Sequence, residues 1–180
     1  SGEAGPFTIP PPTCLSLDSA EETTRLGTAL ASALFPGLLV CLRGNLGAGK
    51  STLAQGIGRG LGLRRMASPS FILLREYPTS PPLVHGDLYR LQEEEIPSLH
   101  LDEYLSQGYV VLLEWAERFQ ATVFPDRWDL CLETPFLDDP DQPFDRRILR
   151  AWGHSATSLS SLEKGIHCFT SQEQERKGQR

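Results

Sequence analysis

The sequence lacks any apolar run long enough to cross a lipid bilayer, although hydrophobic residues make up 39% of its 180 positions. Its first residues do not form the charged segment followed by an apolar segment that marks a secretory signal. We therefore expect a soluble, cytoplasmic protein without membrane contact. The length favours one domain with a substantial core, and no internal repeat divides the chain.

Positive charge is also scarce, with 17 Lys and Arg against 23 Asp and Glu and a formal net charge of −6. This balance argues against a sequence-independent binder of polyanions, although it permits a local basic patch. Cysteines at metal-binding or redox spacing are missing too. The four cysteines lie far apart, without C-x-x-C spacing or nearby histidine pairs, at Cys14, Cys41, Cys131 and Cys168. We expect them to be reduced.

One glycine-rich stretch carries most of the chemical information. Residues 44–51 read Gly-Asn-Leu-Gly-Ala-Gly-Lys-Ser and satisfy G-x-x-x-x-G-K-[ST], the phosphate-binding P-loop. An apolar run typical of a buried strand precedes it, and apolar residues at helical spacing follow it. Loop N–H groups and the helix N-terminus would bind phosphate, Lys50 would reach the β- and γ-phosphates, and Ser51 would ligate Mg²⁺. The residues predicted to bind nucleotide here are Leu46, Gly47, Ala48, Gly49, Lys50, Ser51 and Thr52.

The flanking sequence predicts an α/β domain. Residues 19–22 form a capping box that opens an amphipathic helix, which we expect to end before Pro36. A short helix is expected at 101–106. Strands are predicted at 38–43, 71–76, 83–88, 109–115, 128–133 and 147–152. Gly56, Gly58 and Gly60 would weaken the helix after the P-loop unless another element packs closely against it.

The domain limits follow from composition. Residues 1–13, rich in Gly and Pro, are predicted to form a flexible lead-in. Residues 14–154 are expected to form the P-loop domain. The remaining residues, 155–180, would be a C-terminal extension, which is polar enough from residue 171 onward to be poorly ordered.

Three further groups add chemistry. Four apolar residues precede Glu114, so this carboxylate would end a buried strand beside the P-loop strand and hold Mg²⁺ directly or through water. Residues 85–90 read His-Gly-Asp-Leu-Tyr-Arg, and the pattern by itself favours a salt-bridged turn in which Asp87 accepts backbone hydrogen bonds. Residues 68–71 form a hydroxyl-rich turn where nucleotide-sensing switches often lie.

The order of these motifs, from the P-loop through Ser-Pro-Ser-Phe and His-x-Asp-Leu-Tyr-Arg-Leu to Leu-Glu-Trp at 113–115, closely resembles the TsaE family, formerly YjeE. The match covers roughly residues 17–153. It implies a single P-loop domain with a mixed, partly antiparallel sheet flanked by helices. Family members are P-loop ATPases needed to make threonylcarbamoyladenosine at position 37 of tRNA.

The resemblance also implies site residues and partners. ATP and Mg²⁺ would be the ligands, with Ser51 and Glu114 as metal partners, Lys50 at the phosphates and Asp87 as the acid needed for hydrolysis. Ser19 and Ala20 would lie near the adenine, and Trp115 near the nucleotide. TsaB and TsaD would form the partner assembly, so that tRNA is contacted only indirectly and activity without partners is weak.

Departures from the family pattern are Asn45 for the usual aspartate, Ser70 for threonine and Ala116 for proline. None removes a phosphate or metal ligand. Two alternatives remain open at this stage. ATP binding could switch a scaffold whose hydrolysis is incidental, or the chain could be a small-molecule kinase. A GTPase is disfavoured because no Asn-Lys-x-Asp element occurs.

Overall fold

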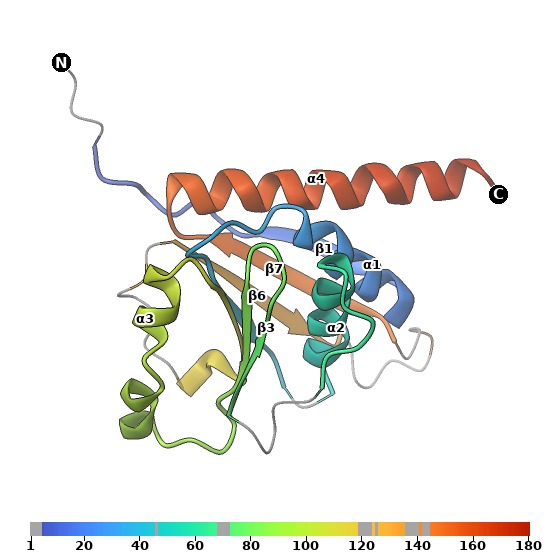
Figure 1. Ribbon diagram of the computed structural model, residues 1–180. Coiled ribbons are helices and arrows are strands. Elements are labelled where there is room, and N and C mark those ends of the chain that lie inside the picture. The colour runs from blue at the N-terminus through green and yellow to red at the C-terminus, as the bar shows by residue number, and fades with distance from the viewer. Residues whose placement is uncertain are drawn as a thin grey trace.

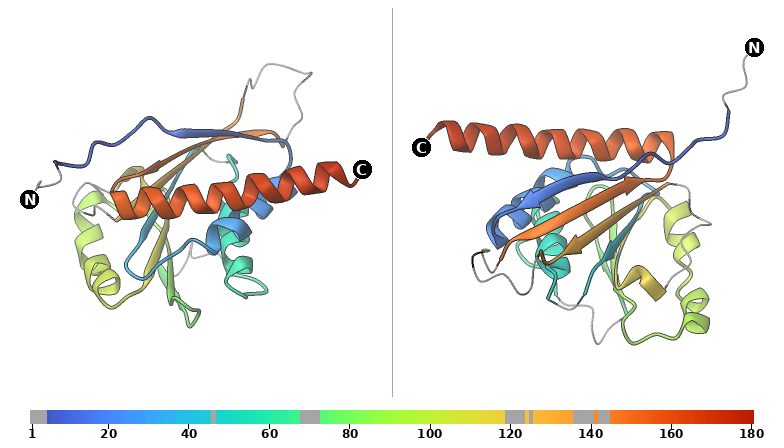
Figure 2. Two further views of the ribbon diagram at one scale, coloured as in Figure 1. Left: turned by 90° about the horizontal axis from the view of Figure 1, so that it is seen from above. Right: turned by 180° about the vertical axis from the view of Figure 1, so that it is seen from behind.

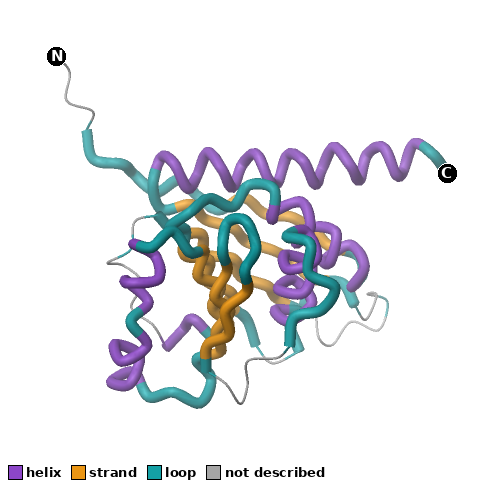
Figure 3. Tube along the Cα trace, viewed as in Figure 1, coloured by secondary structure: helices purple, strands orange, loops and turns teal. Residues whose placement is uncertain are grey.

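The computed structural model describes residues 5–45, 47–67, 73–118, 124, 126–135, 141 and 145–180. Within these residues one seven-stranded sheet is flanked by helices (Figures 1 and 3). The strands are β1 (Thr13–Leu17), β2 (Leu39–Arg43), β3 (Leu74–Tyr77), β4 (Leu83–Asp87), β5 (Val110–Glu114), β6 (Arg127–Glu133) and β7 (Arg147–Gly153). The helical elements are α1 (Ala20–Ala31), α2 (Lys50–Gly60), η1 (Glu93–Leu99), α3 (Leu101–Ser106), η2 (Ala116–Arg118) and α4 (Ala156–Gly178).

The sheet is mixed, as predicted, with the strand order β1-β7-β6-β2-β5-β4-β3. The inner strands β6, β2, β5 and β4 are parallel, whereas β7, β1 and β3 pair antiparallel. The strands predicted at 83–88, 109–115, 128–133 and 147–152 all form, with ends shifted by one residue. The strand predicted at 71–76 corresponds to β3, and its residues 71 and 72 lie outside the described residues.

The central strands are buried on both faces. Val40 and Leu42 of β2 belong to the core packed beneath α1, α2 and α4. Leu39 and Cys41 face the second core, on the side of η1 and α3. This double burial explains why β2 reads as a continuous apolar run. It also raises the pKa of the Cys41 thiol to about 12. All four cysteines are free thiols, as expected.

Close approach between α1 and α2 explains two of the glycines of the P-loop helix, Gly56 and Gly60. A Cβ added to Gly27 of α1 would lie 2.6 Å from the carbonyl oxygen of Leu53 in α2. A Cβ on Gly56 would likewise collide with the carbonyl oxygen of Thr24. The two helices therefore require glycine where they meet, and the packing against α1 offsets the low helix propensity of α2.

Strand β1 was not predicted from the sequence. It pairs with β7 at the edge of the sheet, so the predicted lead-in ends where β1 begins at Thr13. Only Leu17 of this strand is fully buried, and the burial of its other residues alternates weakly. An edge strand with one strongly buried residue gives little periodicity to detect.

The prediction that the chain is poorly ordered from residue 171 is wrong, because α4 continues to Gly178 (Figures 1 and 2). Ile166 and Phe169 pack into the core shared with α1. One turn further on, Arg25 of α1 donates to both carboxylate oxygens of Glu173 at 2.6 and 3.0 Å. Segment 155–173 is therefore packed on the domain, and residues 174–180 are exposed. No helix of the described residues is long and apolar enough to cross a membrane.

We predict that Phe169→Ala destabilises the protein by about 3–5 kcal/mol, because the side chain is 3% exposed and its loss leaves a cavity between α4 and α1. Urea denaturation of the parent and the variant measures the difference. Gln172→Ala, an exposed substitution on the same helix, should change the unfolding free energy by less than about 0.5 kcal/mol. Equal stability of the parent and Phe169→Ala would mean that α4 does not contribute to the core.

Candidate functional site

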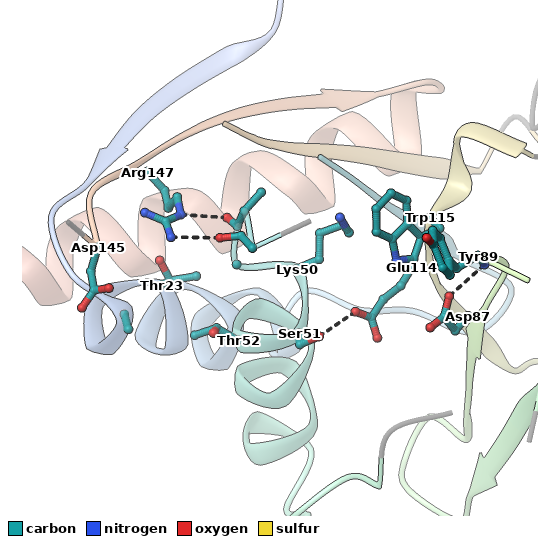
Figure 4. A pocket seen from close by; sticks show the side chains of 14 residues that line it. Thr23, Lys50, Ser51, Thr52, Asp87, Tyr89, Glu114, Trp115, Asp145 and Arg147 are labelled. Atoms are coloured by element: carbon teal, nitrogen blue, oxygen red, sulfur yellow. Dashed lines mark hydrogen bonds between the residues drawn. The ribbon is translucent and has the colours of Figure 1, made fainter. Parts of the chain in front are cut away.

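A cavity of about 510 Å³ lies at the edge of the sheet where the parallel strands β2, β5 and β4 end. Residues from the P-loop, α1, β4, β5 and the start of β7 line it (Figure 4). Parallel strands bring their carboxyl ends to one edge, and open α/β sheets bind ligands at that edge. The lining residues are Ala20, Thr23, Gly47, Ala48, Gly49, Lys50, Ser51, Thr52, Asp87, Tyr89, Glu114, Trp115, Asp145 and Arg147.

The P-loop forms one wall of this cavity, between β2 and α2. Gly47 and Gly49 have φ angles of +78° and +99°, which favour glycine because a Cβ is disfavoured there. Gly49 is the N-cap of α2, and no side chain caps the helix. The first N–H groups of α2 thus remain available to an anion. Leu46, predicted to bind nucleotide, lies outside the described residues.

Lys50 is folded into the cavity and is 5% exposed. Its ammonium donates to the backbone oxygens of Gly44 and Asn45, at 3.1 Å for Asn45, and lies 3.8 Å from the centre of the Trp115 ring. Burial lowers the pKa of Lys50, while the carboxylates of Glu117, Glu114 and Asp87 act in the opposite direction. The cavity therefore contains a partly desolvated cation surrounded by acceptors.

Glu114 is held by two hydrogen bonds at the end of β5. Ser51 Oγ donates to Oε1 at 3.0 Å, and His85 Nε2 lies 2.8 Å from Oε2. A carboxylate only accepts, so the proton lies on Nε2 of His85. Burial by itself would raise the pKa of Glu114, but His85, Ser51 and Lys50 together outweigh it and lower the pKa. Glu114 is thus a fixed carboxylate beside the P-loop serine.

Asp87 ends β4 directly beside Glu114, its register partner on β5. Its Oδ1 accepts a hydrogen bond from the backbone N–H of Tyr89 at 2.9 Å (Figure 4). This bond is the one expected of a turn acid, and the side chain also lines the cavity. The predicted switch segment at residues 68–71 lies outside the described residues.

Trp115 follows Glu114 with a φ of +59°, an uncommon conformation for a bulky residue. This turn places the indole over Lys50 and beside Tyr89, whose ring centre lies 4.8 Å away. A left-handed conformation in a non-glycine residue stores strain of order 1–3 kcal/mol, and such strain clusters at functional sites. Trp115 lines the cavity. That it lies near a nucleotide stays a prediction of the resemblance.

The opposite end of the cavity contains Ala20, which the resemblance placed near the adenine, and three residues that the sequence did not point to, Thr23, Asp145 and Arg147. Ser19 caps α1 by accepting from the Glu22 N–H at 3.1 Å, whereas Ala20 and Thr23 line the cavity. Asp145 and Arg147 lie at the same end (Figure 4). Because β7 runs antiparallel to β6, its first residues return to the P-loop edge of the sheet. Only the strand pairing, which is not evident from a single sequence, reveals this position.

The side chains of the cavity fit a metal ion that takes few ligands from the protein and most of its ligands from phosphate oxygens and water. In the described part of the chain no three His, Cys, Asp or Glu side chains converge on one point. Ser51 and Glu114 offer one hydroxyl and one carboxylate, which are already held together by their hydrogen bond. Mg²⁺ is commonly bound by one or two protein oxygens together with phosphate oxygens and water. A closed metal site would need more side-chain ligands.

Comparisons with known proteins give one family throughout. The family model "Threonylcarbamoyl adenosine biosynthesis protein TsaE" matches residues 17–139. The TsaE protein of Nostoc sp. PCC 7120 is 42% identical over 119 residues, covering 62% of this chain and 73% of that protein. The Streptomyces coelicolor TsaE protein is 42% identical over 123 residues, covering 65% and 82%.

A solved structure agrees with these sequence relatives. The crystal structure of Bacillus subtilis YdiB superimposes with a TM-score of 0.72 and 26% identity, covering 90% of this chain and 98% of that chain. The family model alone spans more than half of the sequence and includes the P-loop, Asp87 and Glu114. The chain therefore belongs to the TsaE family of threonylcarbamoyladenosine biosynthesis proteins.

Proposed function

We propose that this chain is a Mg²⁺-dependent ATPase that acts with TsaB and TsaD in forming threonylcarbamoyladenosine at position 37 of tRNA. The observation that carries the proposal is the meeting of four groups in one cavity. The uncapped P-loop helix, Lys50, the Ser51–Glu114 pair and Asp87 all line it. Each group matches a part that phosphoryl transfer from a P-loop nucleotide requires.

Phosphate binding is assigned to the P-loop and Lys50. The N–H groups that begin α2 and the positive end of its dipole favour an anion. Lys50 now donates to two neutral carbonyl oxygens, of Gly44 and Asn45. Phosphate oxygens are charged and are therefore stronger acceptors for an ammonium. Within the cavity, Lys50 would exchange these carbonyl acceptors for oxygens of the β- and γ-phosphates.

The metal role is assigned to Ser51 and Glu114. Bound Mg²⁺ would neutralise charge on the phosphate oxygens. His85 holds Oε2 of Glu114 on the side away from Ser51. Carboxylates that ligate a metal are commonly held by hydrogen bonds from neighbouring groups. Glu114 is 6% exposed, so the metal would meet a carboxylate that is already fixed and partly dehydrated.

The hydrolytic role is assigned to Asp87. One oxygen of this carboxylate accepts from the Tyr89 N–H, which orients the group, and the other can accept a proton or orient water. Its register partner Glu114 lies on the neighbouring strand, so the metal and water roles would be adjacent. Arg147 is the one arginine among the described lining residues, and it binds P-loop carbonyl oxygens at the far end of the cavity. This supports weak activity without a partner.

The assignment of partners is supported by family membership and by the acidic balance of the chain. With a formal net charge of −6, the chain is poorly suited to neutralising many backbone phosphates. We therefore assign tRNA contact to the assembly rather than to this subunit. Comparing ATP hydrolysis with and without purified TsaB and TsaD tests the assignment of these two proteins as partners. Equal hydrolysis rates would argue against activation by the assembly.

Lys50→Ala should lower the affinity for ATP at least about tenfold, equivalent to about 1.4 kcal/mol, because the variant loses the cation at the terminal phosphates. Isothermal titration calorimetry measures the affinity, and thermal denaturation checks that the variant is folded. Lys164→Ala, an exposed substitution on α4, should leave the affinity unchanged. Unchanged ATP affinity in folded Lys50→Ala would overturn the P-loop assignment.

Glu114→Gln should weaken ATP binding in Mg²⁺ about tenfold and change binding in EDTA much less, because the lost charge acts through the ion. Calorimetry under both conditions gives the two ratios. Glu133→Gln removes a carboxylate from the end of β6, where it pairs with Arg150 outside the cavity, and should change neither ratio. Equal losses in Mg²⁺ and EDTA for Glu114→Gln would assign Glu114 a structural role only.

Asp87→Asn should leave folding and ATP binding intact but reduce hydrolysis in the presence of TsaB and TsaD by at least about a hundredfold. Asparagine retains an oxygen that can accept from the Tyr89 N–H, so the turn should persist. The measurements are phosphate release and repeated rounds of tRNA modification. Hydrolysis close to that of the parent would mean that Asp87 only stabilises the turn at Tyr89 and is not needed for hydrolysis. Lost hydrolysis with undiminished repeated modification would favour the scaffold alternative.

A further inference from the structure

Arg147 is the first residue of β7 and lies at the same edge of the sheet as the P-loop. β6 is parallel to the P-loop strand β2, so β6 ends at the P-loop edge of the sheet. β7 is antiparallel to β6, so it begins at that same edge. Arg147 is half-buried there and lines the cavity. It lies beyond residue 139, the last residue that the family model matches.

The Arg147 guanidinium binds two consecutive carbonyl oxygens of the P-loop. Its Nε donates to Ala48 O at 3.1 Å, and its Nη2 donates to Gly47 O at 3.0 Å (Figure 4). Its Nη1 also donates to the backbone oxygen of Arg146 at 2.9 Å. The side chain runs past Gly49, where an added Cβ would lie 3.9 Å from Cγ and Nε of Arg147. The planar fork of arginine suits such a pair of acceptors.

These two hydrogen bonds determine which way the N–H groups of the same peptides point. In a trans peptide the C=O and N–H groups point in opposite directions. Holding the carbonyls of Gly47 and Ala48 toward Arg147 therefore turns the N–H groups of Ala48 and Gly49 away from it. The Ala48 N–H lies 3.0 Å from Asn45 O, on the inner side of the loop. Gly49 lines the cavity, and the N–H of its peptide lies on the side away from Arg147 because the Ala48 carbonyl is held by the guanidinium.

Around Gly47 and Gly49 the loop has no side chain of its own that could restrain the backbone. Gly47 and Gly49 lack side chains and have positive φ angles, and glycine loses more conformational freedom on ordering than any other residue. A loop that is already ordered loses less entropy when the nucleotide binds. A positive charge beside the carbonyls also polarises both peptides, which makes their N–H groups stronger donors.

We propose that Arg147 is a positioning residue for nucleotide binding, whose guanidinium fixes the orientation of the two P-loop peptides that lead into α2. The inference rests on the proposed function, since it assumes that the cavity binds a nucleotide. It adds a role for β7, outside the segment shared with the family model. Arg147 acts through the loop backbone and so affects ADP and ATP alike.

The test measures ADP and ATP affinities of the full chain and three variants by calorimetry. Arg147→Met keeps an unbranched stem but removes the donors. Arg147→Lys keeps the charge but cannot reproduce the two-pronged geometry. Arg150→Met removes the same charge from the same strand, where Arg150 pairs with Glu133, and serves as the matched control. Hydrogen exchange of the nucleotide-free proteins, followed in peptides covering residues 44–52, reports the order of the loop directly.

We expect Arg147→Met to bind ADP and ATP about tenfold more weakly, by the same factor for both, and Arg147→Lys to recover only part of the loss. Exchange in the P-loop peptides of Arg147→Met should be at least about threefold faster, with β4 and β5 peptides unchanged. Arg150→Met should match the parent in every measurement.

Four results would contradict the inference. Parent-like affinities and exchange in Arg147→Met would show that the loop does not need the guanidinium. A loss confined to ATP would indicate a direct contact with the γ-phosphate instead of loop positioning. An equal loss of affinity in Arg150→Met would show that the effect comes from the loss of one positive charge on β7 and not from the contacts with the loop. A parent protein that binds neither nucleotide would overturn the proposed function, and this inference with it. A parent that binds nucleotide, together with an Arg147→Met variant that binds equally well, would overturn this inference only.

Discussion

The candidate site depends on the register between the parallel strands β2, β5 and β4. Leu42 at the end of β2 pairs with Glu114, and Glu114 pairs with Asp87. Both carboxylates therefore reach the edge of the sheet where the P-loop begins. A slip of one residue would turn Glu114 to the opposite face. Burial of both faces of β2 and β5 makes such a slip costly, so core packing and site chemistry are set by the same pairing.

The helical layer supports the other wall of the cavity. Glycines let the backbones of α1 and α2 approach closely, and this approach brings Ala20 and Thr23 to the side of the P-loop helix. α4 packs along α1 and is tied to it by the pair of Arg25 and Glu173. The C-terminal helix thus contributes to a cavity wall that it does not itself line. Stability far from the P-loop and the shape of the site are linked through α1.

Local patterns predicted most of the fold and the place of the P-loop between β2 and α2, because a buried strand, a glycine loop and a helix start are each encoded within a few residues. Glu114 could be found because it ends such a strand. Residues that depend on distant pairing were missed. Arg147 faces the P-loop only because β7 returns along β6, and β1 is recognisable as a strand mainly through its pairing with β7. Glu173 looked like part of a polar tail because its partner Arg25 lies 148 residues away in sequence.

The end of β5 joins the two sides of the proposed chemistry. Glu114 turns toward Ser51, and the positive φ of the next residue sends the Trp115 ring over Lys50. One strand end thereby positions a carboxylate beside Ser51, where we propose that the metal binds, and an aromatic face over Lys50, the proposed phosphate-binding cation. An extended residue at position 115 would direct the indole elsewhere and leave Lys50 with only backbone oxygens. The strain at Trp115 thus accompanies the placement of two unlike groups around one cavity by consecutive residues.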